Sequence, residues 1–257
     1  GVGVSVVNAL SEWLEVRVHT NGKEYFMRLE RGVPVTELQI LGSSNRKGTI
    51  ITFRPDATIF ETTEFSFDYL TTRLRELAFL NRGVRIILKD ERSDRVHDFK
   101  YDGGINSFVE YLNQNKKPIF PKPIHIESAK EGMEFEVSLQ YNDGYQENIF
   151  SFANNINTIE GGTHLSGFKR GLTSAVNAYI KNADLLKNEK VGPTGEDIRE
   201  GLTAVISVKI TNPQFEGQTK TKLQNSDVEG IVGSAVYEKL MVYFEEHPGE
   251  AKNISMK

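Results

Sequence analysis

Apolar and polar residues alternate in several short stretches of the chain, and this period of two predicts half-buried β-strands. The expected strands cover residues 14–18, 25–29, 48–53, 84–88, 96–99, 133–139, 149–153 and 202–210. Asn21-Gly22, between the first two strands, is a residue pair that tight hairpin turns prefer. The alternation over residues 202–210 is long and uninterrupted, which indicates a central strand.

Elsewhere apolar residues recur every three or four positions, which predicts amphipathic helices. The expected helices cover residues 1–10, 66–80, 105–112, 163–180 and 226–245. Gly83 suits a left-handed position just beyond the second helix. Thr163 is the expected N-cap of the fourth helix, and Ser226-x-x-Glu229 is the expected capping box of the fifth. Pro248-Gly249 is expected to end that last helix.

Strands and helices are mixed without the regular alternation of a doubly wound sheet, so the chain is predicted to be α+β. Asp102-Gly103-Gly104 interrupts the pattern, and several prolines follow soon after it. We therefore expect two domains, residues 1–103 and residues 104–257. A length of 257 residues with 38% hydrophobic residues supplies enough apolar material for two cores.

Composition excludes some classes of protein. No window approaches eighteen apolar residues, so neither a membrane span nor a membrane partner is expected. Cysteine is absent, which excludes disulfides and thiolate metal sites and fits a cytoplasmic location. The net charge of −4 argues against a surface that grips DNA everywhere, but it allows a local basic lining. Because the chain does not begin with methionine, it is interpreted as a fragment, a processed product or a sequence without its true start.

Two segments could bind a phosphate. Gly1-Val2-Gly3-Val4-Ser5 precedes a helix, whose first backbone N–H groups can bind an anion, yet two glycines alone more often form only a tight turn. Gln218-Thr219-Lys220 lies in the polar loop 212–223 after the central strand. Lys220 could meet a terminal phosphate there as a point charge, but the residues by themselves favour a solvated surface lysine.

Other polar residues give weaker signals. Thr49 could hydrogen-bond a ligand at a sheet edge, although a β-branched strand residue needs no ligand. His164 could titrate near neutrality, but we expect its segment to cap a helix rather than to catalyse. The basic residues of the second half are expected by default to lie on solvated faces. The candidates among them for facing DNA are Lys169, Arg170, Arg199 and Lys222. The histidines show no ligand spacing, so no side-chain metal site is predicted.

Five segments resemble, in order and over almost the whole chain, the ATP-binding B subunits of bacterial type II DNA topoisomerases, the family of DNA gyrase and topoisomerase IV. They are Gly1 to Ser11, Arg75-Glu76-Leu77-Ala78-Phe79-Leu80-Asn81, Tyr101-Asp102-Gly103-Gly104-Ile105, Glu160-Gly161-Gly162-Thr163-His164 and Pro213-Gln214-Phe215-Glu216-Gly217-Gln218-Thr219-Lys220-Thr221-Lys222-Leu223. The resemblance implies that residues 1–103 are the later part of a GHKL-type ATPase sandwich. It implies that residues 104–257 are a transducer domain with a left-handed β-α-β fold of the ribosomal-protein-S5 domain 2 type.

The resemblance also implies roles for individual residues. Gln218 and Lys220 would reach the γ-phosphate of ATP as the catalytic residues of this chain, and Thr49 would join the hydrogen bonds beneath the adenine. The backbone amides expected to contact the phosphates are those of Gly1, Val2, Gly3 and Val4. ATP and Mg²⁺ are the implied cofactors. The family's general-base glutamate, magnesium-binding asparagine and adenine-reading aspartate all precede the glycine-rich segment, so this chain alone is not expected to hydrolyse ATP.

In this family, ATP binding would close two B subunits around duplex DNA, and hydrolysis would reopen them. The implied partners are duplex DNA, a second B subunit and the gyrase A subunit, and the implied activity is strand passage with negative supercoiling. Two alternatives stay open. Topoisomerase IV, which decatenates DNA, shares these motifs. A non-catalytic fragment could instead contact DNA or a partner protein through the basic residues of the second half.

Overall fold

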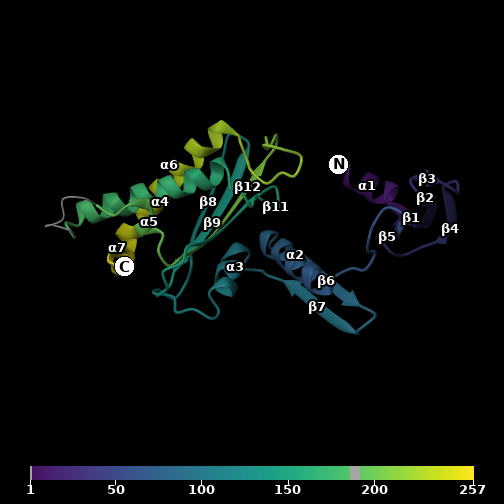
Figure 1. Cartoon of the computed structure of the whole chain (residues 1–257), viewed down its shortest axis with the longest axis horizontal. Helices are drawn as coiled ribbons and strands as arrows, with labels where there is room; N and C mark the ends of the chain where they lie inside the picture. The colour runs from purple at the N-terminus through teal and green to yellow at the C-terminus, as the bar shows by residue number, and fades with distance from the viewer. Residues whose placement is uncertain (1, 186–191) are drawn as a thin grey trace. The chain divides into compact units, whose positions relative to one another are not determined.

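The computed structural model describes residues 2–185 and 192–257, which form two compact units (Figure 1). The first unit is Gly1–Phe67 and the second is Asp68–Lys257. This division by contacts falls earlier in the chain than the predicted domain boundary between residues 103 and 104. The mixture of helices and sheets confirms the α+β class. Among the described residues, no helix is both long and apolar enough to cross a lipid bilayer.

The first unit consists of a short helix and a five-stranded sheet. Its elements are α1 (Gly3–Ala9), β1 (Ser11–Thr20), β2 (Lys23–Glu30), β3 (Val33–Pro34), β4 (Gln39–Ser43) and β5 (Gly48–Pro55). The strands follow the order β3-β2-β1-β5, and β4 pairs with β2, so β5 is an outer strand. Asn21 and Gly22 have φ angles of 51° and 74°, so the predicted hairpin turns through two left-handed residues.

The second unit contains a five-stranded sheet, a two-stranded hairpin and helices on both faces of the larger sheet. Its elements are α2 (Phe67–Leu80), β6 (Arg85–Asp90), β7 (Arg95–Lys100), α3 (Ile105–Leu112), β8 (Ile124–Lys130), β9 (Met133–Tyr141), β10 (Asn148–Ala153), β11 (Ile156–Asn157), α4 (Thr163–Asn182), α5 (Gly195–Ile198), β12 (Leu202–Ile210), α6 (Ser226–Glu246) and α7 (Pro248–Ser255). The sheet order is β11-β10-β12-β9-β8, with β12 at the centre as predicted. Because β12 runs parallel to β10, α4 lies in the crossover that connects these two strands.

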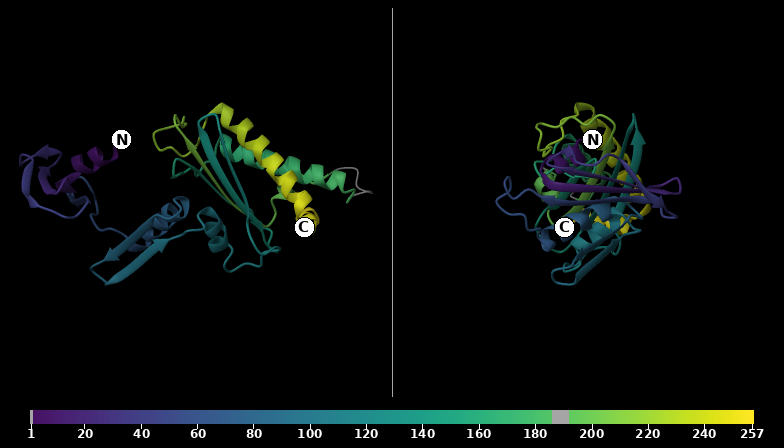
Figure 2. Two further views of the ribbon diagram at one scale, coloured as in Figure 1. Left: turned by 180° about the vertical axis from the view of Figure 1, so that it is seen from behind. Right: turned by 90° about the vertical axis from the view of Figure 1, so that its right-hand side faces the viewer.

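Helices α4 and α6 lie side by side over one face of this sheet (Figure 2). Alternate residues of β12 are fully buried beneath them, namely Leu202, Ala204, Ile206 and Val208. Glycines let the two helices approach closely, because a Cβ on Gly171 would lie 2.5 Å from the carbonyl oxygen of Gly233. The apolar stripe and the glycines of α4 therefore act together to pack this helix against both the sheet and α6.

The opposite face of the sheet is covered by α3 and the C-terminal end of α2. Phe79 of α2 stacks on Phe108 of α3, with ring centroids 4.7 Å apart. Both rings belong to a buried cluster that includes Phe152 of β10 and Val205 of β12. This packing explains why α2 belongs by contacts to the second unit, although the predicted domain boundary lies after it.

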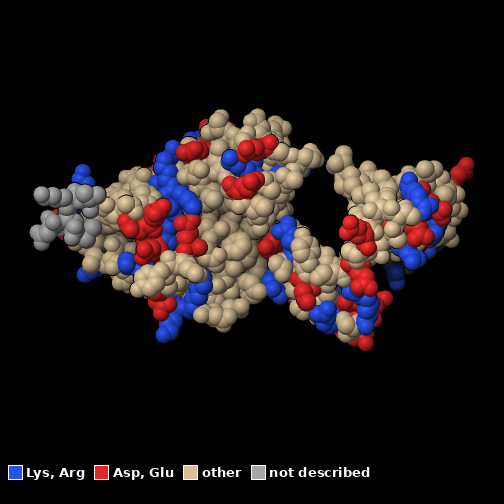
Figure 3. Space-filling model, viewed as in Figure 1, with Lys and Arg blue, Asp and Glu red and all other residues tan. Residues whose placement is uncertain are grey.

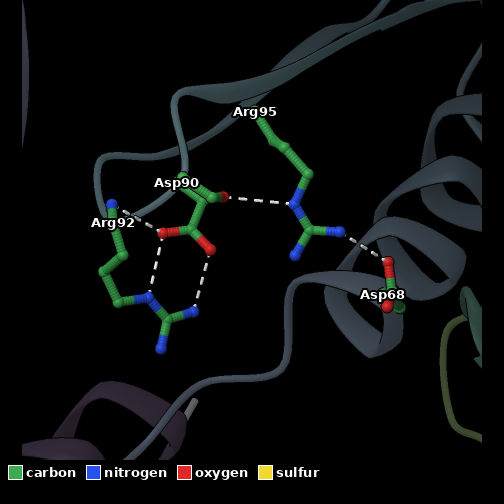
Figure 4. Close-up of polar contacts among 5 residues, drawn as sticks. Asp68, Asp90, Arg92 and Arg95 are labelled. Atoms are coloured by element: carbon green, nitrogen blue, oxygen red, sulfur yellow. Dashed lines mark hydrogen bonds and ion pairs between the residues drawn. The ribbon is translucent and has the colours of Figure 1, made fainter.

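Charged side chains close the β6–β7 hairpin (Figure 4). Asp90 accepts a hydrogen bond from the backbone N–H of Arg92 at 3.0 Å and two from its guanidinium at 2.9 Å. The guanidinium and backbone hydrogen bonds lower the pKa of Asp90 to about 2. Arg95 donates to Asp68 at 3.1 Å and so ties the hairpin to the first turn of α2.

Several local predictions are corrected by the structure. The N-cap of α4 is Gly162 rather than Thr163, whose hydroxyl has no hydrogen-bond partner among the described residues. The predicted capping box at Ser226 is wrong, because the N-cap of α6 is Asn225, whose side chain makes no capping hydrogen bond to the helix. Helix α6 ends at Glu246, near its predicted end, but Pro248 then begins α7. Strand β8 lies outside the expected strands. Its alternation of apolar and polar residues is too short to predict a strand.

Candidate functional site

The predicted phosphate-binding segment lies at the start of α1, except for Gly1, which is outside the described residues. Val2 is the N-cap of α1, and its apolar side chain makes no capping hydrogen bond to the helix. By helix geometry, the amides of Gly3 and Val4 have no partner within the helix. Gly3 and Val4 are exposed, and a Cβ built on Gly3 would meet no atom within 4 Å. The segment therefore fits a group that accepts hydrogen bonds, such as a phosphate.

Thr49 lies near the start of β5, where it pairs with Val18 of β1. The residue is exposed, and β5 is an outer strand of its sheet. Its hydroxyl is therefore accessible at a sheet edge, which is compatible with a ligand contact. The role of Thr49 beneath an adenine stays a prediction.

Gln218 and Lys220 lie together at the exposed tip of the loop that connects β12 with α6. The loop folds back on itself, and the N–H of Glu216 donates to the carbonyl of Lys222 at 3.0 Å across its two arms. A second backbone bond, from the N–H of Lys220 to the carbonyl of Gly217 at 3.0 Å, closes the tip. The predicted phosphate-contacting side chains are thus presented by a small hairpin and not by an irregular coil.

Lys220 adopts a backbone conformation that is unusual for a lysine. Its φ angle is 57°, which lies in the left-handed region that costs a residue with a Cβ on the order of 1 kcal/mol. Within residues 2–185 and 192–257, its ammonium group forms neither a hydrogen bond nor an ion pair. An unpaired cation on a strained residue at a loop tip is free to bind an anionic ligand.

Asn225 holds the base of the loop. Its side-chain oxygen accepts from the N–H of Gln214 at 2.7 Å, and its side-chain nitrogen donates to the carbonyl of Asn212 at 3.1 Å. Asn225 is buried, so these bonds satisfy polar atoms that water does not reach. The side chain that could have capped α6 is therefore used to fix the start of the loop.

The second arm of the loop is bound to the turn that precedes α4. Glu160 donates its N–H to the carbonyl of Thr221 at 3.0 Å, and Leu223 donates to the carbonyl of Gly161 at 3.1 Å. Thr163, the first residue of α4, donates to the carbonyl of Leu223 at 3.0 Å. The hydroxyl of Thr221 also donates to the carboxylate of Glu160. Two segments that the sequence marks separately are therefore in contact, and no local pattern could have predicted this.

His164 is fully buried behind this turn. Its Nε2 lies 3.0 Å from the hydroxyl oxygen of Thr158, and its Nδ1 has no hydrogen-bond partner in the described part of the chain. Burial lowers the pKa of His164 to about 4, so the ring is neutral at physiological pH. The N-cap of α4 lies in this segment, as predicted, but it is Gly162, and the neutral ring of His164 does not fit the predicted titration near neutrality.

The comparison with protein families decides the identity of this fold. The sequence model of DNA gyrase B matches residues 104–257, which is more than half of the chain. The chain belongs to the DNA gyrase B family. The match begins at Gly104 and includes both the loop with Lys220 and the turn with Glu160.

Named members of the gyrase B family match the chain from end to end. The DNA gyrase B subunit of Myxococcus xanthus is 55% identical over 257 residues, all of this chain and 32% of that protein. Its counterpart in Clostridium acetobutylicum is 56% identical over 249 residues, 96% of this chain and 39% of that protein. The chain thus spans about a third of the length of these relatives.

Solved structures of this family share the fold. The 43K ATPase domain of Thermus thermophilus gyrase B, in complex with an aminocoumarin, is 40% identical with a TM-score of 0.86; the match covers 99% of this chain and 69% of that one. The topoisomerase IV ATP binding domain of Francisella tularensis is 32% identical with a TM-score of 0.83. That match covers 100% of this chain and 70% of the Francisella chain. The predicted relation to ATP-binding domains of this family is confirmed.

The four basic residues predicted to face DNA are all held by carboxylates. Lys169 and Arg199 share Glu147, which Arg199 contacts at 2.7 Å. The remaining pairs are Arg170 with Glu229 at 3.1 Å and Lys222 with Glu216 at 2.8 Å. On the face drawn in Figure 3, blue and red side chains lie next to one another. Their predicted role toward DNA stays untested, but the carboxylates reduce the charge available to a phosphate backbone.

The described residues hold no group of three or more histidine and carboxylate side chains that could bind a metal ion. Lys220 and the amides at the start of α1 suit the anionic part of a nucleotide and not a cation. A magnesium ion that accompanied ATP would therefore need ligands other than the residues predicted here.

Proposed function

We propose that this chain is the part of a bacterial DNA gyrase B subunit that binds the phosphates of ATP. Binding of these phosphates is then signalled to the rest of the enzyme. The observation that carries the proposal is the unpaired Lys220 ammonium at the tip of a loop whose base and second arm are both anchored. Membership of the gyrase B family supports it. In domain terms, residues 1–103 would belong to the GHKL-type ATPase domain and residues 104–257 to the transducer.

In the proposed complex, the amides of Gly3 and Val4 donate to phosphate oxygens, and Thr49 hydrogen-bonds near the adenine. Lys220 donates to the γ-phosphate, and Gln218 donates beside it. Phosphoryl transfer spreads negative charge over the terminal oxygens, so a positioned lysine stabilises the transition state more than the ground state. Bound Mg²⁺ would supply further charge neutralisation at these oxygens. ADP lacks the group that Lys220 contacts, so the loop distinguishes ATP from ADP.

The whole enzyme would use this site to operate a clamp on DNA. ATP binding closes two B subunits around a DNA duplex, and hydrolysis resets them during strand passage. A second B subunit, the gyrase A subunit and duplex DNA are the proposed partners, in the cytoplasm. We favour gyrase over topoisomerase IV because the family model that matches is that of DNA gyrase B. Negative supercoiling by the reconstituted holoenzyme tests this choice, and a decatenase without supercoiling activity would contradict it.

The role of Lys220 is tested by Lys220→Ala in the full-length subunit. Removal of a positioned donor to transition-state charge commonly costs about 10²-fold to 10³-fold in kcat, so we expect ATP turnover to fall by about 10²-fold. Lys239→Ala on α6 removes another exposed lysine and is the matched control. Steady-state ATPase assays and ATP-dependent dimerisation are the measurements. Wild-type turnover in Lys220→Ala would overturn the assignment.

A further inference from the structure

The second arm of the Lys220 loop is the middle segment of a three-segment backbone ladder. On one side it pairs with the first arm, where the N–H of Glu216 donates to Lys222 at 3.0 Å. On the other side it pairs with the turn before α4, where the N–H of Glu160 donates to Thr221 at 3.0 Å. The second arm is therefore bound laterally to the turn before α4, and the first arm is held near its base by Asn225. Lys220 directly precedes the bound residue Thr221.

Gly162 permits this ladder to form. Its φ angle is 136°, and a Cβ on it would lie 2.3 Å from the carbonyl oxygen of Leu223 and 2.6 Å from its nitrogen. No side chain fits in that space, so the turn and the loop touch backbone to backbone. The next residue, Thr163, is the first of the twenty-residue helix α4. The loop is thus connected directly to the start of a helix that packs along the length of α6.

Glu160 is the one residue of the turn that holds Thr221 through both its backbone and its side chain. Its N–H donates to the carbonyl of Thr221, and its carboxylate accepts from the hydroxyl of the same residue. The ammonium of Lys222 pairs with Glu216 at 2.8 Å, and the nearby charge of Glu160 also helps to raise the pKa of Lys222. Beyond Thr221, the backbone of the tip is held by the bond from the N–H of Lys220 to the carbonyl of Gly217.

We propose that Glu160 is a positioning residue for Lys220: by fixing Thr221, it sets where the lysine ammonium lies when the γ-phosphate is bound. This inference rests on the function proposed above for Lys220. Thr221 adjoins a lysine held at a left-handed φ angle, so release of Thr221 lets the backbone of the tip relax away from that conformation. A misplacement of about 1 Å in a reacting group can cost on the order of 10²-fold in rate.

Three variants in the full-length subunit test the role of Glu160. Glu160→Ala removes the acceptor, and Thr221→Val removes the hydroxyl but keeps the shape of the side chain. Glu160→Gln keeps an oxygen that can accept from Thr221. We expect kcat for ATP to fall about tenfold in the first two, because a misplaced lysine loses charge stabilisation of the transition state. Glu160→Gln should keep kcat within about threefold of wild type. Glu245→Ala, at an exposed carboxylate of α6, is the control.

A purely structural role would lower stability without changing nucleotide preference. We therefore also measure the ratio of affinities for a non-hydrolysable ATP analogue and for ADP, which should fall in Glu160→Ala and Thr221→Val but not in Glu160→Gln. In a Lys220→Ala background, Glu160→Ala should lower kcat less than about twofold further, because the group that it positions is gone.

Failure of this inference is distinguishable from failure of the proposed function. If Lys220→Ala loses turnover while Glu160→Ala and Thr221→Val keep wild-type kcat and nucleotide preference, the positioning role is overturned and the role of the lysine stands. Additive losses from Glu160→Ala and Lys220→Ala would also overturn it. If Lys220→Ala keeps normal turnover, the proposed role of the lysine falls and that of Glu160 falls with it.

Discussion

His164 occupies a buried position that disfavours the charged form of its ring. It is fully buried, one ring nitrogen lies beside the hydroxyl of Thr158, and the other has no partner among the described residues. A protonated ring would carry a second N–H donor and a positive charge. Water does not solvate either of them at this buried site. Burial therefore lowers the pKa to about 4 from the ordinary value of 6.5. The sequence identifies the histidine, but its protonation state depends on what surrounds it.

This pKa makes stability depend on pH in a defined window. The unfolded chain takes up the proton near pH 6.5 and the folded chain only near pH 4, so the stabilisation is complete above about pH 6.5 and is lost as the pH falls toward 4. Between pH 7 and pH 5 we expect His164 to remove about 2 kcal/mol from the free energy of unfolding. The glutamine in His164→Gln cannot titrate. Urea unfolding at pH 7 and pH 5 should therefore show a smaller decrease in the free energy of unfolding for this variant than for the wild type. Equal losses in both proteins would contradict the buried neutral state.

At the level of elements, the crossing of α4 and α6 depends on backbone contact. A Cβ on Gly171 would lie 2.5 Å from the carbonyl of Gly233 and 3.0 Å from Cβ of Val236. Glycine normally weakens a helix relative to alanine, so Gly171 lowers the intrinsic stability of α4 and Gly233 that of α6. Close packing compensates for that loss. Gly230 of α6 offers the opposite situation, because a Cβ there would meet no atom within 4 Å.

The two kinds of glycine should respond oppositely to the same substitution. Gly171→Ala forces the helices apart, and overpacking of this kind costs about 1–3 kcal/mol of stability. Gly230→Ala gains helix propensity without a clash and should stabilise by about 0.5–1 kcal/mol. The free energies of unfolding from denaturant titration provide the measurement. Stabilisation by Gly171→Ala would show that the helices do not cross as closely as described.

At the scale of the whole molecule, the chain carries a net charge of −4, and its candidate DNA-facing cations are paired with carboxylates. Counterion release from DNA depends on cations that are free to neutralise phosphates. Ion pairs at the protein surface compete for the same cations. The alternative that this chain acts alone as a DNA-contacting module therefore finds little support in its charge distribution.

We expect the isolated chain to bind duplex DNA weakly, with a dissociation constant above about 10⁻⁵ M at physiological salt, in the range of nonspecific binding. Removal of Glu147 by Glu147→Gln frees Lys169 and Arg199 and should strengthen binding and steepen its salt dependence. Fluorescence anisotropy with a labelled duplex at several salt concentrations measures both. If the unmodified chain bound DNA tightly, and Glu147→Gln left that affinity unchanged, carboxylates would not be what limits the binding of DNA by these cations.

Sequence patterns predicted the long elements well where one period dominates. Strand β12 and helices α2, α4 and α6 lie close to their expected positions, because each carries an uninterrupted apolar stripe. Helix caps were predicted less well, because a cap depends on which polar groups lie nearby in space. The side chain of Asn225 bonds the loop backbone rather than α6, and the hydroxyl of Thr163 bonds no described residue.

The sequence by itself determined the α+β class, the order of the main elements and the family, because these depend on local periodicity and on motifs read along the chain. It also identified Lys220 and the glycine-containing turn before α4 as separate features. Only the tertiary structure decided that Glu160 binds Thr221, that Lys220 has a left-handed backbone and that His164 is buried and neutral. The contact between Glu160 and Thr221 joins residues about sixty positions apart, and local patterns carry no information about such contacts.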